Sequence, residues 1–219
     1  NHRQLTINAE GGDDTINIGV GTYNNGASGT GNGISKTDIA GLPTVDGIEE
    51  NTSLDRIHAD IKINSGLGND TLHIDDSTDT KENTAYITDT MVAGLSRNEL
   101  TGDANFDNDN DVAIEYDTNL ENLNVYLGQN DDRVFVEQTF ANNTTIVGNG
   151  GSDAILAKEL NGNVVLEGDS SDQDIPAVHA NVNGINTPQE EKADHIFIDT
   201  ISDGSTVNIS TDRGDDIVD

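Results

Sequence analysis

The sequence predicts an all-β fold of the solenoid class, in which short strands stack coil upon coil. The first observation is a turn ending in Asp that recurs between two strands with alternating apolar residues. The second is the spacing of these turns, because Asp132 and Asp153 are 21 positions apart and Asp194 and Asp216 are 22 apart. The third is the low hydrophobic fraction of 32%, without Trp, which suits a narrow column of Val, Ile and Leu.

Each predicted strand–turn–strand unit places apolar residues at fixed distances from its last turn Asp. They stand nine and seven positions before this residue and two and four after it. Side chains alternate along a strand, so these four positions share one face. Equivalent Asp residues of stacked coils would then form a ladder along one edge, about 4.8 Å apart. The clearest units are Leu5, Ile7, Ile16 and Ile18 around Asp14; Ile61, Ile63, Leu72 and Ile74 around Asp70; and Leu123, Val125, Val134 and Val136 around Asp132.

The wider gaps between units are expected to hold inserted loops, at about 20–47, 77–111 and 173–193. The first of these is rich in Gly, Asn and Ser, which is typical of flexible segments. Residues 84–95 alternate like a pair of strands within the second. We interpret 1–219 as a single β-solenoid segment of a longer or polymerising protein.

The charge of the chain narrows the classes of partner. There are 41 acidic and 10 basic residues, which gives a formal net charge of −31. Such a charge repels nucleic acid and anionic membrane surfaces, and no apolar run reaches the roughly 20 residues that span a bilayer. Self-repulsion of this size calls for bound cations or screening salt, and the acidic surface of a halophilic protein would look similar. Regular alternation of apolar residues argues against disorder.

Three segments carry a resemblance to a known class of proteins. They are INSGLGNDTLHIDDSTDT (63–80), MVAGL (91–95) and IEYDTNLENLNVYLGQNDDRVFVEQT (114–139). Their order and spacing resemble large repetitive surface and secreted proteins of bacteria, with repeats of the LNVNLGSGNDTF type, over roughly residues 59–157. The resemblance implies a right-handed parallel β-helix or β-roll, and the spacing of the Asp turns predicts coils of about 21 residues. The resemblance also implies a secreted, extracellular or cell-surface location.

The Asp turns are candidates for calcium ligation or for turn capping. GLGNDTLHI (66–74) is similar to the hemolysin-type calcium-binding repeat, which implies Ca²⁺ as a cofactor. In the alternative, each Asp accepts hydrogen bonds from backbone N–H groups of its turn. Doubled acids favour the metal, since one carboxylate suffices for a cap. The candidate ligands are Asp13, Asp14, Asn69, Asp70, Asp131, Asp132, Asp153, Asp172, Asp215 and Asp216.

A second candidate calcium site is an acidic loop with oxygen-bearing side chains at alternate positions, as in an EF-hand. The acid expected at position 12 of such a loop is missing, because Ile114 stands there and Glu115 is one residue late. The alternative is a solvated acidic loop. The residues concerned are Asp103, Asn105, Asp107, Asp109 and Asp111.

These observations predict a non-enzymatic structural module, such as an adhesin stalk, a matrix or surface-layer component, or a filament subunit. Its expected partners are neighbouring repeats or identical subunits stacked head-to-tail. The alternative is a carbohydrate-binding or polysaccharide-processing β-helix, in which Tyr23, Tyr86 and Phe106 would stack on surface glycans instead of packing on the solenoid flank. The sequence contains no H-E-x-x-H motif, no nucleophile elbow and no phosphate-binding Gly loop.

Overall fold

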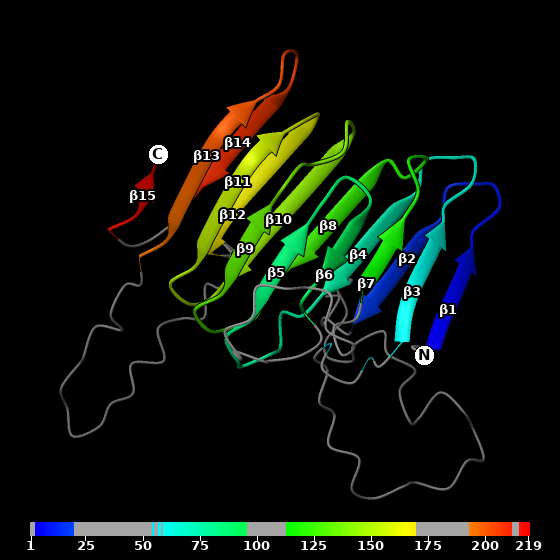
Figure 1. Ribbon diagram of the computed structural model, residues 1–219, viewed down its shortest axis with the longest axis horizontal. Coiled ribbons are helices and arrows are strands. Elements are labelled where there is room, and N and C mark those ends of the chain that lie inside the picture. The colour runs from blue at the N-terminus through cyan, green and yellow to red at the C-terminus, as the bar shows by residue number, and fades with distance from the viewer. Residues whose placement is uncertain are drawn as a thin grey trace, which may run out of the picture.

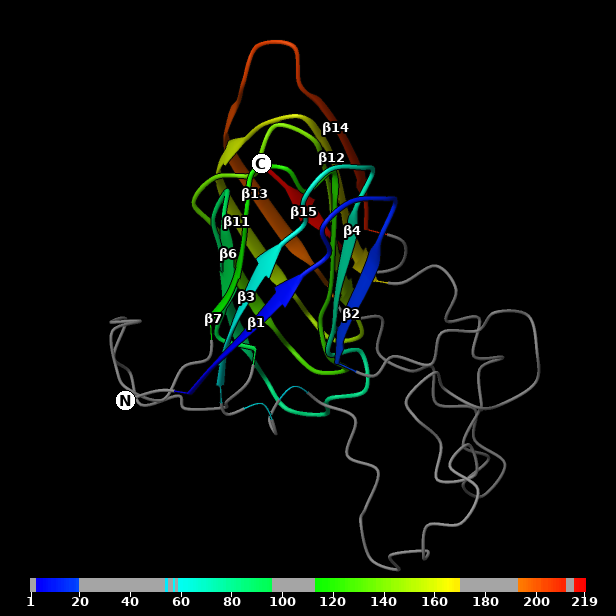
Figure 2. The ribbon, with the colours of Figure 1, turned by 90° about the vertical axis from the view of Figure 1, so that its right-hand side faces the viewer.

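The structure is a computed structural model that describes residues 3–19, 54, 57, 59–95, 113–169, 193–211 and 215–219. Within these residues the fold is all-β, with fifteen strands in two sheets and no α-helix. The strands stack along the long axis of the molecule (Figure 1), and the two sheets flank a common interior (Figure 2). None of the described residues form a helix long and apolar enough to cross a membrane.

The two sheets contain strands that alternate along the chain. In spatial order, the nine-stranded sheet contains β1 (Arg3–Asn8), β3 (Ala59–Asn64), β7 (Ala113–Tyr116), β6 (Met91–Ala93), β5 (Thr84–Ile87), β9 (Arg133–Val136), β11 (Ala154–Leu160), β13 (His195–Ile201) and β15 (Ile217–Val218). The six-stranded sheet contains β14 (Thr206–Ser210), β12 (Asn163–Asp169), β10 (Asn143–Asn149), β8 (Asn122–Tyr126), β4 (Thr71–Asp75) and β2 (Thr15–Gly19).

Most neighbouring strands pair in parallel, with apolar residues of adjacent strands opposite one another. Leu5 lies opposite Ile61 in one sheet, and Leu72 lies opposite Leu123 in the other. Parallel neighbours of this kind require the chain to leave the sheet between them, and here it crosses to the second sheet. The prediction of an all-β fold with parallel sheets is therefore confirmed.

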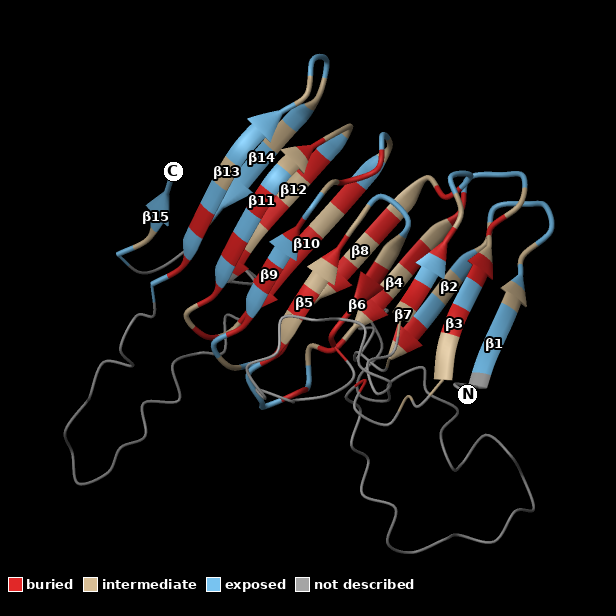
Figure 3. Ribbon diagram, viewed as in Figure 1, coloured by how far each residue is buried: buried red, intermediate tan, exposed pale blue. Residues whose placement is uncertain are grey.

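The core lies between the sheets and is made by every second residue of each strand. In β4 and β8 the burial alternates along the strand, and Leu72, Ile74 and Val125 are completely buried. Figure 3 shows the same alternation as bands across the strands. Each fully buried Leu or Ile contributes about 1.5–3 kcal/mol, so the column of apolar side chains holds successive coils together.

One segment departs from the parallel arrangement. β6 runs antiparallel to both β5 and β7, so the chain folds back on itself within the nine-stranded sheet. The strand pair predicted at 84–95 is thus confirmed, inside the segment that we expected to be a loop at 77–111. In the six-stranded sheet β4, β8 and β10 are direct neighbours, so β5 and β6 have no counterpart there. Residues 20–47, 96–111 and 173–192 of the expected loops lie outside the described residues.

Candidate functional site: two edges of turn carboxylates

The recurring Asp turns lie along two edges of the molecule. We call the turns that lead from the nine-stranded to the six-stranded sheet the first edge, and the turns that lead back the second edge. Asp14 and Asp70 lie on the first edge, immediately before β2 and β4. The remaining turn acids immediately precede strands of the nine-stranded sheet and lie on the second edge: Asp132, Asp153, Asp194 and Asp216.

The expectation of one Asp ladder along one edge is therefore wrong. The fold-back through β5, β6 and β7 adds strands to one sheet only, so the motif resumes half a coil later. Around Asp70 the motif begins in the nine-stranded sheet with β3, whereas around Asp132 it begins in the six-stranded sheet with β8. The local apolar pattern is the same in both cases, because each strand buries one face in the same core.

On the second edge, the turn residues of successive coils are joined by a continuous ladder of hydrogen bonds. The backbone N–H of each donates to Oδ1 of the turn Asp in the next coil. The N–O distances are 2.6 Å from Asn83 to Asp132, 2.8 Å from Asp132 to Asp153, 2.8 Å from Asp153 to Asp194 and 2.9 Å from Asp194 to Asp216. Hydrogen bonds from N–H groups to carboxylates are roughly twice as strong as neutral ones, so each turn Asp fastens its coil to the preceding one.

The carboxylates of Asp132, Asp153 and Asp194 are buried, and glycine makes room for the last two. Asp153 and Asp194 are each only 2% exposed. A Cβ atom at Gly148 would lie 2.2 Å from Asp153 Oδ2, and one at Gly168 would lie 2.0 Å from Asp194 Oδ2. A side chain at either glycine would therefore displace the carboxylate that forms the ladder.

A third glycine binds its carboxylate directly. The N–H of Gly128 donates to Asp132 Oδ2 at 2.8 Å. Gly128, Gly148 and Gly168 are not among the residues that the Asp-turn pattern identifies. Their even spacing of 20 residues is the signal that identifies them: Gly128 follows β8, and Gly148 and Gly168 are the last but one residues of β10 and β12.

Burial has a measurable electrostatic consequence at two positions of the ladder. Desolvation raises the pKa of Asp132 to about 6, against the effect of its backbone hydrogen bonds and with a further contribution from the charges of Asp79 and Asp131. Desolvation also raises the pKa of Asp194 to about 6, with the charge of Asp216 acting in the same direction. The ladder thus contains carboxyl groups that take up protons well above the usual range for Asp.

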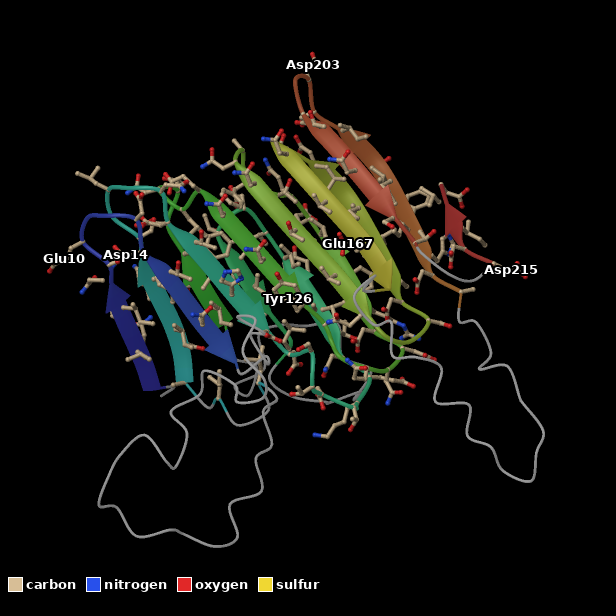
Figure 4. All side chains as sticks on the ribbon, turned by 180° about the vertical axis from the view of Figure 1, so that it is seen from behind. Glu10, Asp14, Tyr126, Glu167, Asp203 and Asp215 are labelled. Atoms are coloured by element: carbon tan, nitrogen blue, oxygen red, sulfur yellow. The ribbon has the colours of Figure 1, made fainter. Side chains whose placement is uncertain are left out.

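The first edge begins with the same arrangement and then loses its charges. The N–H of Asp14 donates to Asp70 Oδ1 at 2.9 Å, and the N–H of Asp70 donates to Glu121 Oε2 at 2.8 Å. Figure 4 shows Asp14 at one end of the molecule and Asp215, of the second edge, at the other. The equivalent residues in the following coils, each immediately before a strand of the six-stranded sheet, are uncharged: Asn142, Gly162 and Ser205.

Hydrogen bonding to the backbone of neighbouring coils is enough to explain the doubled acids. Asp13 Oδ1 accepts the N–H of Asn69, and Asp131 Oδ1 accepts the N–H of Ser152, both at 2.9 Å and both in the following coil. The second acid of the Asp131–Asp132 doublet accepts from the preceding coil. One doublet therefore bonds in both directions, so doubling by itself no longer argues for a metal.

The oxygen atoms that lack partners indicate how well these edges would fit calcium. Buried carboxylate oxygens without a hydrogen-bond partner occur on both edges: Asp14 Oδ2 and Asp70 Oδ2 on the first and Asp194 Oδ2 on the second. Ca²⁺ takes six to eight oxygen ligands, and in the described part of the chain no three His, Cys, Asp or Glu side chains are grouped to hold a metal. The fit is thus partial on both edges. Asp215 is exposed, whereas Asp172 and the predicted ligands at 103–111 lie outside the described residues.

A buried cluster of polar side chains is not predicted from the sequence. It lies between β4 and β5, beside the start of the ladder. The Asn83 Nδ2 group donates to Asp76 Oδ2 at 3.2 Å and to Asp79 Oδ2 at 3.0 Å, and these three residues are at most 4% exposed. The run DDSTDT (75–80) and the Asn immediately before β5 are the only signal in the sequence.

Comparisons with protein-family models, curated proteins and solved structures returned no match for this chain.

Proposed function

We propose that this chain is a non-enzymatic structural module, a right-handed β-solenoid segment with coils of about 21 residues, in an extracellular or cell-surface bacterial protein. The observation that carries the proposal is the second-edge ladder. Buried Asp side chains there serve as links between neighbouring coils, which is the chemistry of a rod rather than of a reactive site.

The ladder and the core act in the same direction. Each strand pairs only with the strands beside it in its sheet, so stabilising contacts add up along the stack. A chain built in this way serves as a stalk, matrix component or filament subunit. Its partners in this proposal are neighbouring repeats or identical subunits stacked head-to-tail.

The structural role is favoured over polysaccharide processing by the placement of the acids. Asp132 and Asp153 are at most 2% exposed, and each accepts a backbone N–H of the preceding coil. A glycosidase or lyase needs carboxyl groups that reach substrate. The carbohydrate-binding alternative stays a prediction.

Calcium remains part of the proposal, with the first-edge turns and the 103–111 segment as its sites. Asp14 and Asp70 would supply carboxylate oxygens there, and the charge that the ion brings would offset part of the repulsion within the chain. Thermal unfolding in EDTA, Mg²⁺ and Ca²⁺ at fixed ionic strength tests this. We expect a rise in the melting temperature specific to Ca²⁺ that Asp70→Asn reduces. An equal rise with both ions, or with salt alone, would instead indicate charge screening.

Single-molecule force spectroscopy tests the structural role itself. A chain pulled from its two ends is expected to unwind in steps of about one coil, each of which releases roughly 70 Å at 3.3–3.6 Å per residue. Asp153→Ala should lower the unwinding force, whereas Asp203→Ala, on the exposed turn between β13 and β14, should leave it unchanged. Turnover of an acidic glycan by the chain, or a force that does not depend on the ladder, would contradict the proposal.

A further inference from the structure

The outer face of the nine-stranded sheet carries a row of apolar side chains in register across four adjacent strands. Tyr86 of β5 lies opposite Phe135 of β9, Phe135 lies opposite Leu156 of β11, and Leu156 lies opposite Phe197 of β13. Phe135, Leu156 and Phe197 are 39%, 43% and 42% exposed. We call Tyr86, Phe135, Leu156 and Phe197 the apolar row. Contiguous apolar side chains at a protein surface mark sites of interaction.

Charged side chains flank the apolar row on both sides. Toward the start of the strands stand Arg133 of β9 and His195 of β13, two positions before the row. Two positions after the row stand Glu137, Lys158 and Asp199, and Lys158 forms an ion pair with Glu137. All five side chains are exposed. His195 already contacts Asp219 Oδ2 of its own chain at 3.4 Å, so Arg133 is the fixed positive charge of one margin, whereas the other margin is mainly acidic.

We propose that this face binds a second copy of the chain, face to face, across a two-fold axis that runs along the apolar row. This rotation reverses the direction of the strands and places the apolar row of one copy on that of the other. Arg133 then lies over Glu137 of the second copy, and His195 lies over Asp199 of the second copy. A two-fold interface must be complementary to itself, and the two margins of this face satisfy that requirement.

The charge of the face favours a second copy more than the charge of the whole chain suggests. Arg133 and Lys158 balance Glu137 and Asp199 on these four strands, and Asp219 beside β13 adds one negative charge at the margin, whereas the chain as a whole carries −31. The two copies therefore repel each other at long range and attract each other at contact. Because salt screens the long-range part most, association should strengthen with ionic strength, which is opposite to an interface made by ion pairs alone.

The interface is small. The face spans four strands, each with about three outward residues. The area that it can bury lies at or below the lower end of the range for stable complexes, which is about 1,200 Å² in total. The dimer is therefore weak and reversible. It joins solenoids side by side and does not depend on the head-to-tail stacking of the proposed function.

Sedimentation equilibrium of the full chain tests the dimer at concentrations up to the millimolar range. We expect the average mass to rise from 23.2 kDa toward twice that value as NaCl increases from about 0.1 M to about 1 M. The double variant Phe135→Thr, Phe197→Thr should raise Kd at least about tenfold. Leu67→Thr is the matched control, because Leu67 is 80% exposed on a first-edge turn away from the face. Circular dichroism establishes that each variant folds.

A charge swap tests the orientation of the two copies. Arg133→Glu and Glu137→Arg should each weaken the dimer, because each places like charges over one another. The double variant, which carries both changes, restores the pair across the axis and should regain much of the affinity lost by Glu137→Arg. Failure of this rescue, with the dimer otherwise intact, would exclude the two-fold arrangement proposed.

Cross-linking supplies an independent readout, because the chain has no Cys. The axis places Leu156 close to Leu156 of the second copy, so Leu156→Cys should be joined by a short bis-maleimide. Asn124→Cys, on the outer face of the six-stranded sheet, should not.

Three results would overturn the proposal. One is a chain that stays monomeric at all salt concentrations. Another is open-ended association beyond the dimer that ignores the Phe135→Thr, Phe197→Thr change, which indicates end-to-end stacking. The third is a monomer that is retarded in gels containing a neutral polysaccharide, with the retardation lost in the same double variant. The apolar row would then be a sugar-binding surface.

Discussion

The two edges of the molecule use the same kind of turn but carry different chemistry. On the second edge the residue immediately before the strand is Asp in four coils, from Asp132 to Asp216, and each accepts an N–H from the preceding coil. On the first edge the acids stop after Glu121, and the next coil has Asn142, whose Nδ2 group donates to the carbonyl of Leu120 at 2.9 Å. In these coils, the hydrogen bonds between neighbouring coils involve charged carboxylates on the second edge and neutral groups on the first edge.

This difference shows what a buried carboxylate requires of its surroundings. Like charges about 4.8 Å apart repel, and burial adds the cost of desolvation. The second edge offsets part of these costs with backbone N–H donors and with glycines that leave space, such as Gly148 and Gly168, and the raised pKa values of Asp132 and Asp194 report the part that is left. On the first edge, the turn residue at the corresponding point of the stack is Gly162, whose N–H donates to Ser205 Oγ at 3.0 Å. A neutral acceptor suffices there.

The largest expected effect comes from filling the space behind the ladder. Gly148→Ala places a Cβ 2.2 Å from Asp153 Oδ2 and 2.3 Å from the carbonyl oxygen of Gly168. We expect a loss of about 3 kcal/mol or more from overpacking and from the displaced carboxylate, measured by urea unfolding. Gly150→Ala is the matched control, because its nearest neighbour is 3.4 Å away. Equal losses in both variants would remove the special role given to Gly148.

A smaller effect is expected when one link of the charged ladder is removed. Asp153→Ala leaves the buried N–H of Asp132 without its acceptor, which should cost about 2–3 kcal/mol. On the first edge, Asn142→Ala removes a neutral hydrogen bond and should cost about 1 kcal/mol. Urea unfolding of both variants measures the contrast between the edges. A first-edge loss equal to the second-edge loss would show that charge adds nothing to the ladder.

The dependence of the melting temperature on pH should show a second property of the second edge. Asp132 and Asp194 have pKa values of about 6 in the folded chain and about 3.9 when unfolded. Between these values the native state binds more protons, so stability falls as pH rises through 6 and is regained on acidification. We therefore expect the melting temperature to increase as the pH is lowered from about 7.5 to about 5.

A single substitution isolates this effect from the general relief of charge repulsion. Asp194→Asn should raise the melting temperature at pH 7.5 and flatten its dependence on pH, because Asn keeps the Oδ1 acceptor for the Asp153 N–H without a desolvated charge. Asp203→Asn removes the same charge from an exposed turn and serves as the control. A melting temperature that falls on acidification in the unmodified chain would contradict the assignment.

The smallest effect concerns the last acid of the first edge. Glu121→Ala removes the Oε2 acceptor of the Asp70 N–H and should cost about 1 kcal/mol in urea unfolding. Glu121→Gln keeps an acceptor and should recover most of the loss. If the Gln variant is as unstable as the Ala variant, the charge of Glu121 matters more than its hydrogen bond.

Much of the strand pattern was accessible from particular residues. Ile61, Ile63 and Leu72 around Asp70 alternate in the sequence and are buried in the structure, because a strand against a core exposes every second residue. The strand pair at 84–95 was visible for the same reason. The sequence indicates the apolar row only in part. It offers Tyr86 as a candidate for stacking on glycans, but not Phe135 and Phe197, because only the pairing between distant strands brings these residues together.

The sequence by itself determined that the chain is all-β, that its strands bury alternate residues, and that Asp turns join them, because these properties depend on neighbours within one strand–turn–strand unit. Only the tertiary structure decided which edge each Asp occupies and which N–H it accepts. Those outcomes depend on the fold-back of β5, β6 and β7, which shifts the motif by half a coil while leaving its local pattern unchanged. Local alternation reports which face of a strand is buried, and it carries no information on which sheet that strand joins.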